Sequence, residues 1–121
     1  MERERLHRHD GSEDDNSVNN LPLSEQFRIV AKKWVDADAA ASILEETKSA
    51  VLSKMMMSTG ESAVSKAEMI VKASDDWSIH VTSMVRAREK ASLLKVQLEY
   101  IRMRFSEYQS HEATRRAEMK L

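Results

Sequence analysis

The chain has 121 residues and a formal net charge of −1, with charged side chains at 32% of positions, 2 glycines, 1 proline and no cysteine. So few turn formers exclude a sheet built from several hairpins, and the lack of cysteine excludes disulfides and cysteine–zinc sites. The near-neutral charge gives no strong electrostatic case for nucleic acid, and no apolar run reaches the ~18 residues of a membrane span. We therefore expect an all-α, cytoplasmic protein built from long helices.

The first segment, residues 1–22, is charged and polar and contains few large aliphatic side chains. It cannot bury enough apolar surface to offset the entropy of ordering, so we predict a disordered charged tail. The segment also lacks the apolar core of a secretory signal, and we expect no such signal. The helical domain is predicted to cover residues 23–121.

A first long helix is predicted over about residues 24–57. Ser24 is placed to cap its start, and Gly60 is placed to end it in the left-handed conformation. Its apolar side chains recur at alternating spacings of three and four residues, which is typical of a coiled-coil seam. The seam comprises Phe27, Val30, Trp34, Ala37, Ala41, Leu44, Lys48, Val51 and Met55, with Lys48 as its one charged member.

A short helix is predicted next, over residues 66–73, because Ser65 and Glu68 have the spacing of a capping box. Ser74 begins a second cap signal, so the chain either bends there or continues as one helix, and the sequence leaves both possibilities open. The last helix is predicted over about 75–119, since no glycine or proline interrupts it. Its seam comprises Trp77, Val81, Met84, Ala87, Ala91, Leu94, Leu98, Ile101, Phe105 and Tyr108.

The two long seams are complementary if their helices form an antiparallel hairpin. A single register places large residues opposite large ones at both ends and Ala41 opposite Ala91 in the middle, where the backbones can approach closely. The same register places Glu45 and Glu46 beside Arg86 and Arg88, and flanking charges of this kind select orientation. The predicted fold is an antiparallel helical hairpin, or coiled coil, of two long helices joined by a short one.

The last helix carries a second apolar stripe on nearly the opposite face from its seam. One hairpin partner cannot cover both faces, and the short helix is tethered too far from Met103 to reach it. A second copy of the chain or another protein is therefore the favoured partner, and we expect a homodimer. The expected interface comprises Leu93, Val96, Tyr100, Met103 and Tyr108, the last of these in a stretch, 108–121, that is predicted to overrun the first helix.

Basic residues line both flanks of the last helix, and they raise the alternative of direct nucleic-acid binding. The first helix carries Asp36, Asp38, Glu45 and Glu46, and the register places the first two beside Lys95. Because such pairs would neutralise the flank, we favour a structural role for these charges. If the protein binds nucleic acid directly, the expected contact residues are Arg88, Lys95, Arg102, Arg115 and Arg116.

No motif for catalysis or cofactor binding is present in the sequence. Two glycines are too few for a glycine-rich phosphate loop, and no H-E-x-x-H pair occurs. Neither Glu89 nor Glu99 has the histidine three residues on that a di-metal carboxylate site requires. We therefore predict a protein that is not an enzyme and that binds neither cofactor nor metal.

Several segments in residues 64–121 share a likeness with known proteins, namely VSKAEMIVKAS, KVQLEYIRMRF, SEYQS and RRAEMKL. This half of the chain resembles small all-helical proteins encoded by tailed bacteriophages and prophages. The resemblance implies a protein that acts by binding in the cytoplasm of a bacterial host cell. It would be either an accessory of phage DNA recombination or replication, or an inhibitor of a host defence nuclease complex. The resemblance assigns no catalytic residue.

Overall fold

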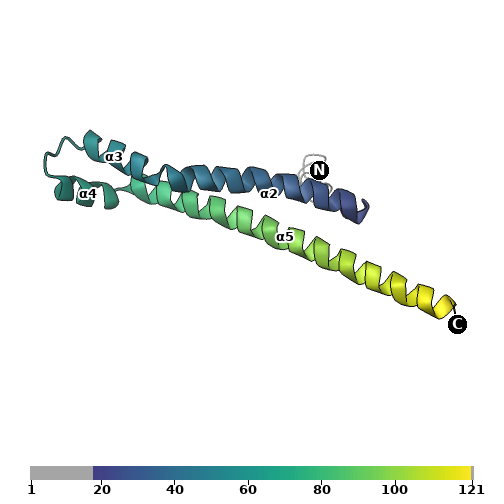
Figure 1. Ribbon diagram of the computed structural model, residues 1–121. Coiled ribbons are helices and arrows are strands. Elements are labelled where there is room, and N and C mark those ends of the chain that lie inside the picture. The colour runs from purple at the N-terminus through teal and green to yellow at the C-terminus, as the bar shows by residue number, and fades with distance from the viewer. Residues whose placement is uncertain (1–17, 121) are drawn as a thin grey trace, which may run out of the picture. The chain divides into compact units, whose positions relative to one another are not determined.

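The computed structural model describes residues 18–120, and within them every regular element is a helix (Figure 1). The helices are α2 (Leu23–Glu46), α3 (Lys48–Ser58), α4 (Val64–Lys72) and α5 (Asp75–Met119). The predicted all-α class is thus confirmed for this part of the chain. Among residues 18–120, none of the helices has an apolar stretch that could span a membrane. Most of the predicted tail, residues 1–17, lies outside the described residues.

The chain divides into two compact units, each of which contains part of α2 and part of α5. Among the described residues, unit 1 comprises residues 18–32 and 96–120, and unit 2 comprises residues 33–95, including α3 and α4. Every buried apolar residue on α2 and α5 lies at a predicted seam position. The buried apolar residues are Val30, Leu98 and Ile101 in unit 1, and Ala37, Ala41, Ala67, Val71, Trp77, Met84 and Ala91 in unit 2.

The start of α2 depends on Gln26, whose side chain is only 3% exposed. Its backbone N–H donates to the carbonyl of Pro22 at 3.0 Å, so the helix begins at Leu23 and the predicted cap, Ser24, lies inside it. The side-chain amide of Gln26 donates to the carbonyl oxygens of Leu21 at 2.7 Å and Asn19 at 3.3 Å. These bonds satisfy a buried amide, and they make residues 18–22 part of the folded structure instead of the tail.

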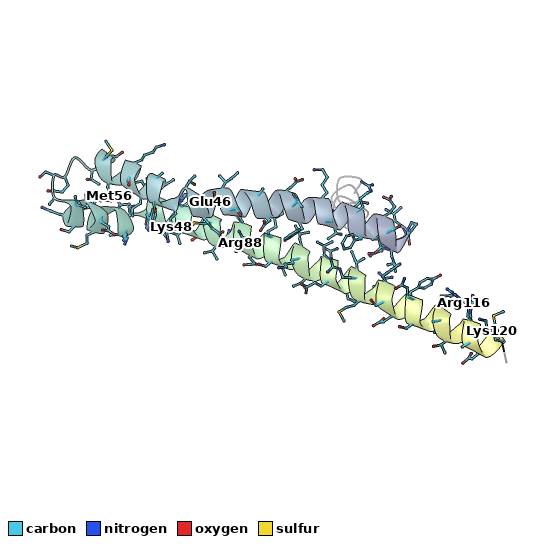
Figure 2. All side chains as sticks on the ribbon, in the orientation of Figure 1. Glu46, Lys48, Met56, Arg88, Arg116 and Lys120 are labelled. Carbon is cyan, nitrogen blue, oxygen red and sulfur yellow. The ribbon has the colours of Figure 1, made fainter. Side chains whose placement is uncertain are left out.

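The sequence predicts one helix over 24–57, whereas the structure has two that meet at Thr47, between Glu46 and Lys48 (Figure 2). Thr47 has φ −90° and ψ 1°, and its hydroxyl donates to the carbonyl of Ile43 at 2.6 Å. A hydroxyl that bonds back to the preceding turn perturbs a helix locally. The backbone N–H of Val51 still donates to the Thr47 carbonyl at 3.0 Å, so the helical hydrogen bonding resumes at once.

The turn after α3 contains Gly60, which has φ +72° as its predicted role as a left-handed cap requires. A Cβ added there would have no atom within 4 Å, so a side chain would fit. The requirement at this position is the positive φ of the backbone. The local cost of a substitution is therefore a backbone cost alone.

We expect Gly60→Ala to lower the free energy of unfolding by about 1 kcal/mol, because alanine is strained in the left-handed region. Gly60→Asn is the matched control and should cost less, since asparagine adopts this conformation more readily. Urea unfolding of the three proteins measures the difference. An alanine variant as stable as the natural chain would show that the turn does not require glycine.

α3 and α4 lie side by side in unit 2 (Figure 1). α4 begins at Val64, two residues earlier than predicted, and its first turn closes between the Ala67 N–H and the Ala63 carbonyl at 3.0 Å. No side chain caps this end, so the predicted capping box of Ser65 and Glu68 is wrong. The helix buries Ala67 and Val71 on one face, and this packing outweighs the local cap signal.

Of the two possibilities at Ser74, the structure has the bend. The Ser74 hydroxyl accepts a hydrogen bond from the Trp77 backbone N–H at 3.2 Å and donates to the Val71 carbonyl at 2.6 Å. The Val71 carbonyl also accepts from the Ser74 backbone N–H at 2.9 Å, so Ser74 caps the start of α5 and binds the end of α4.

Candidate interaction surface

The part of α5 in unit 1 has a row of exposed, large apolar side chains. Val96, Tyr100 and Met103 are 60%, 59% and 61% exposed, and their spacings of four and three residues place them along one line of the helix. On the same helix Ile101 is only 4% exposed. We call Val96, Tyr100 and Met103 the outer stripe. Leu93, three residues earlier on α5 and within unit 2, is also exposed.

Two charged residues flank the outer stripe within unit 1. Glu99 is exposed and forms no ion pair within residues 18–120. Arg104 is half-buried, and its guanidinium carbon lies 5.9 Å from the centre of the Tyr100 ring. One of its nitrogens donates to the side-chain oxygen of Gln26 at 3.5 Å. Gln26 therefore helps to hold Arg104 beside the stripe, a role that was missed because a glutamine near a helix start is usually a surface residue.

Unit 1 also contains an apolar hollow of about 340 Å³. Phe27 and Phe105 both line it. The Arg102 guanidinium carbon lies 5.6 Å from the centre of the Phe27 ring, which is a cation–π distance. Arg102 is therefore engaged within the chain, although the sequence offered it as a nucleic-acid contact. The remaining lining residues are Leu23, Ser24 and Ile101.

The end of α5 stays helical to Met119, and every residue from 105 to 120 is exposed except Glu112, which is half-buried. Tyr108 is 58% exposed, but it follows Tyr100 by eight residues, which places it about 80° around the helix. It therefore lies off the outer stripe, with which the sequence had grouped it. Glu112 pairs with Arg115 at 3.2 Å and not with Arg116, which is exposed at this end (Figure 2).

Unit 2 contains an ion network centred on Arg88, which Figure 2 labels on α5. Its Nη1 is 2.7 Å from Asp38, and its Nε and Nη2 contact the two carboxylate oxygens of Glu45 at 2.9 and 2.7 Å. Nη2 also donates to the hydroxyl of Ser42 at 3.3 Å. Of the two glutamates placed beside Arg86 and Arg88, Glu45 pairs with Arg88. Asp38 also contacts Arg88, and not the Lys95 that it was assigned to.

The network changes the pKa of its members. Hydrogen bonding by Arg88 lowers the pKa of Glu45, against a smaller opposing effect of burial. Hydrogen bonds to Glu45 and then to Asp38 raise the pKa of Arg88 above its usual range. All three side chains are more than one third exposed, so salt and solvent screen these charges.

The lowered pKa of Glu45 predicts a pH-dependent contribution to stability. A carboxylate with a depressed pKa in the folded state stabilises the fold above its unfolded pKa of about 4.3, and this contribution is lost as the pH falls through the folded pKa. We expect Glu45→Gln to be less stable than the natural chain at neutral pH, and this difference should shrink as the pH falls below about 4.

Urea unfolding over a pH series tests this prediction. Glu46→Gln is the control, because Glu46 is adjacent and forms no ion pair among residues 18–120. A Glu45→Gln deficit that is the same at every pH would contradict an electrostatic origin.

Three of the five basic residues assigned to nucleic acid have contacts within the chain. Arg88 and Lys95 belong to unit 2, and Arg102, Arg115 and Arg116 belong to unit 1. Arg88 and Arg115 are ion-paired and Arg102 stacks on a ring, whereas Lys95 and Arg116 form no ion pair within residues 18–120.

Further ion pairs join Arg28 to Glu25, Lys66 to Glu61 and Lys72 to Glu68. His80 stacks on Trp77 with ring centres 5.6 Å apart, and its buried Nε2 has no hydrogen-bond partner in this part of the chain. Among residues 18–120 no three histidine, aspartate or glutamate side chains converge as metal ligands would.

Comparisons with protein-family models, with curated proteins and with solved structures found no match.

Proposed function

We propose that this protein is a non-enzymatic interaction module that binds other proteins through α5, and that a second copy of the same chain is one of these partners. The observation that carries the proposal is the outer stripe. Three aligned large apolar side chains, each about 60% exposed, lie on a helix that also has a buried face. Isolated exposed apolar residues are ordinary on protein surfaces, but an aligned row beside a thin core is typical of an interface.

We propose further that α2 and α5 form an antiparallel hairpin in the predicted register. Within unit 1, Gln26 contacts Arg104 while Phe27 contacts Arg102, so residue numbers rise on one helix as they fall on the other. Within unit 2, the pairing of Glu45 with Arg88 supports the same register. A hairpin covers one face of α5 only, which leaves the outer stripe for a partner.

The resemblance of residues 64–121 to small phage proteins supports a role in the cytoplasm of a bacterial host. A self-associating helical protein could then serve as an accessory of phage recombination or replication, or bind and inhibit a host defence nuclease complex. In either role the outer face of α5 supplies binding, and the reaction belongs to the partner.

Direct nucleic-acid binding is the second candidate. It is favoured by Lys95 and Arg116, which are exposed and form no ion pair within residues 18–120. It is weakened by the intramolecular contacts of Arg88, Arg102 and Arg115.

Light scattering and a gel shift on one preparation distinguish the two functions. For an interaction module we expect the mass to rise toward a dimer between low and high micromolar concentration, without a shift of single- or double-stranded DNA at moderate salt. A monomer at high micromolar concentration that shifts DNA at low salt and releases it at high salt would favour the nucleic-acid function instead.

A further inference from the structure

The spacing of the outer stripe is that of a short coiled-coil seam. Tyr100 and Met103 have the spacing of the first and second core positions, a and d, of a heptad. Val96 then occupies the d position of the preceding heptad. Leu93, three residues before Val96, has the spacing of that heptad's first core position. These apolar side chains can meet those of a second copy in a parallel or an antiparallel arrangement, so the apolar residues alone do not choose between them.

The charged residues beside the seam favour the parallel arrangement. In a parallel, in-register coiled coil, the g residue, which precedes each a position, lies beside an e residue of the other chain. That e residue is five positions later in the sequence. Glu99 directly precedes Tyr100, so it faces Arg104 of the second copy, and the symmetry of the pair makes this contact twice. Arg104 is already held beside the stripe by Gln26 and the Tyr100 ring, and Glu99 is exposed with no ion pair in the described chain. Gln26 uses only Nη1 of Arg104, so the other guanidinium nitrogens remain for Glu99 of the second copy.

The antiparallel arrangement in which every stripe residue meets an apolar residue, with Val96 opposite Tyr100 and Met103 opposite Leu93, brings like charges together. If Val96 faces Tyr100 of the second copy, then Glu99 lies near Glu99 of the second copy, and Arg104 lies near Lys90 of the second copy. Like charges along a seam disfavour that arrangement. The same side chains thus attract in one orientation and repel in the other.

We propose that a second copy of this chain binds the outer stripe in parallel and in register, with Glu99 and Arg104 selecting this orientation. This inference rests on the proposed self-association and specifies its geometry. Exposed charge pairs contribute little affinity, so the apolar stripe drives association and the charges decide its direction. Because the seam is short, we expect weak association, with a dissociation constant in about the micromolar range.

A single cysteine tests the orientation, since the chain has none of its own. In the parallel pair the two copies of Met103 lie opposite each other, so Met103→Cys should form a disulfide between chains under mild oxidation. In the antiparallel pair the two positions would be about 15 Å apart along the axis, beyond the ~7 Å between Cα atoms that a disulfide spans. Gln109→Cys, exposed on the same helix and off the stripe, measures random collisions.

We expect Met103→Cys to cross-link far more than Gln109→Cys, and the difference to disappear on dilution. Equal cross-linking in a chain that is still dimeric would overturn the parallel arrangement and leave the proposed self-association standing. A natural chain that is monomeric at high micromolar concentration would overturn both.

A charge exchange gives a second measurement. Arg104→Glu should weaken association severalfold, because it places two carboxylates together in the parallel pair. Adding Glu99→Arg to that variant should restore association, since the pair is re-formed with its signs reversed. If the second substitution weakens association further, the proposed contact is absent.

Discussion

Replacing Val96 and Met103 together by glutamate is expected to abolish self-association. Each subunit of a dimer would then bury two carboxylates without partners, and an uncompensated buried charge costs several kcal/mol. Both positions are more than half exposed, so the helix itself should tolerate the change. We expect light scattering to show a monomer up to high micromolar concentration, and circular dichroism to show the helix content of the natural chain.

A control variant separates the stripe from net charge. Gln109→Glu with Thr114→Glu adds the same charge at two exposed positions on α5 beyond the stripe. This protein should associate as the natural chain does. If the two double variants dissociate to the same extent, repulsion between whole molecules is the cause, and the outer stripe is not the interface.

Ala41→Leu is expected to cause a large loss of stability in unit 2. Ala41 is 0% exposed and Ala91 is 1% exposed, so neither site has room for three further heavy atoms. Overpacking of this kind costs about 1–3 kcal/mol. In a small domain that is a considerable part of the total free energy of unfolding. Thermal or urea unfolding should show the loss for Ala41→Leu and for Ala91→Leu.

Ala39→Leu is the matched control, because Ala39 lies on the same helix, two residues away, and is exposed. It should leave the stability nearly unchanged. If Ala41 and Ala91 face each other as the predicted register requires, the double variant should depart clearly from the sum of the single effects. Single variants as stable as the natural chain would contradict close packing at these alanines.

The helices were predictable because each buried residue on α2 and α5 except Gln26 follows the spacing of an amphipathic helix. Seam positions such as Val30, Ile101 and Trp77 are buried as their spacing indicates. The ends of the helices were less predictable. The distortion at Thr47 depends on one hydroxyl, and the starts of α2 and α4 depend on Gln26 and on the burial of Ala67, which override the cap signals of Ser24 and Ser65.

The candidate surface was predictable to the extent that it depends on periodicity. The exposure of Val96, Tyr100 and Met103 follows from their position away from the seam. The partners of long charged side chains did not follow in the same way, because an arginine reaches several turns of a neighbouring helix. Arg88 therefore contacts Asp38 as well as Glu45, and Arg102 lies over a phenylalanine ring. Sequence position alone does not rank such alternatives.

The most direct test of the central claim, that the face of α5 around Tyr100 is the self-association surface, uses the two tyrosines of the chain. Tyr100 and Tyr108 are 59% and 58% exposed on the same helix, so they form a matched pair. Fluorotyrosine can be incorporated at both, with Tyr108→Phe assigning the signals. With rising concentration we predict that the fluorine resonance of Tyr100 shifts while that of Tyr108 stays in place. A fixed Tyr100 resonance, with or without movement at Tyr108, would contradict the claim.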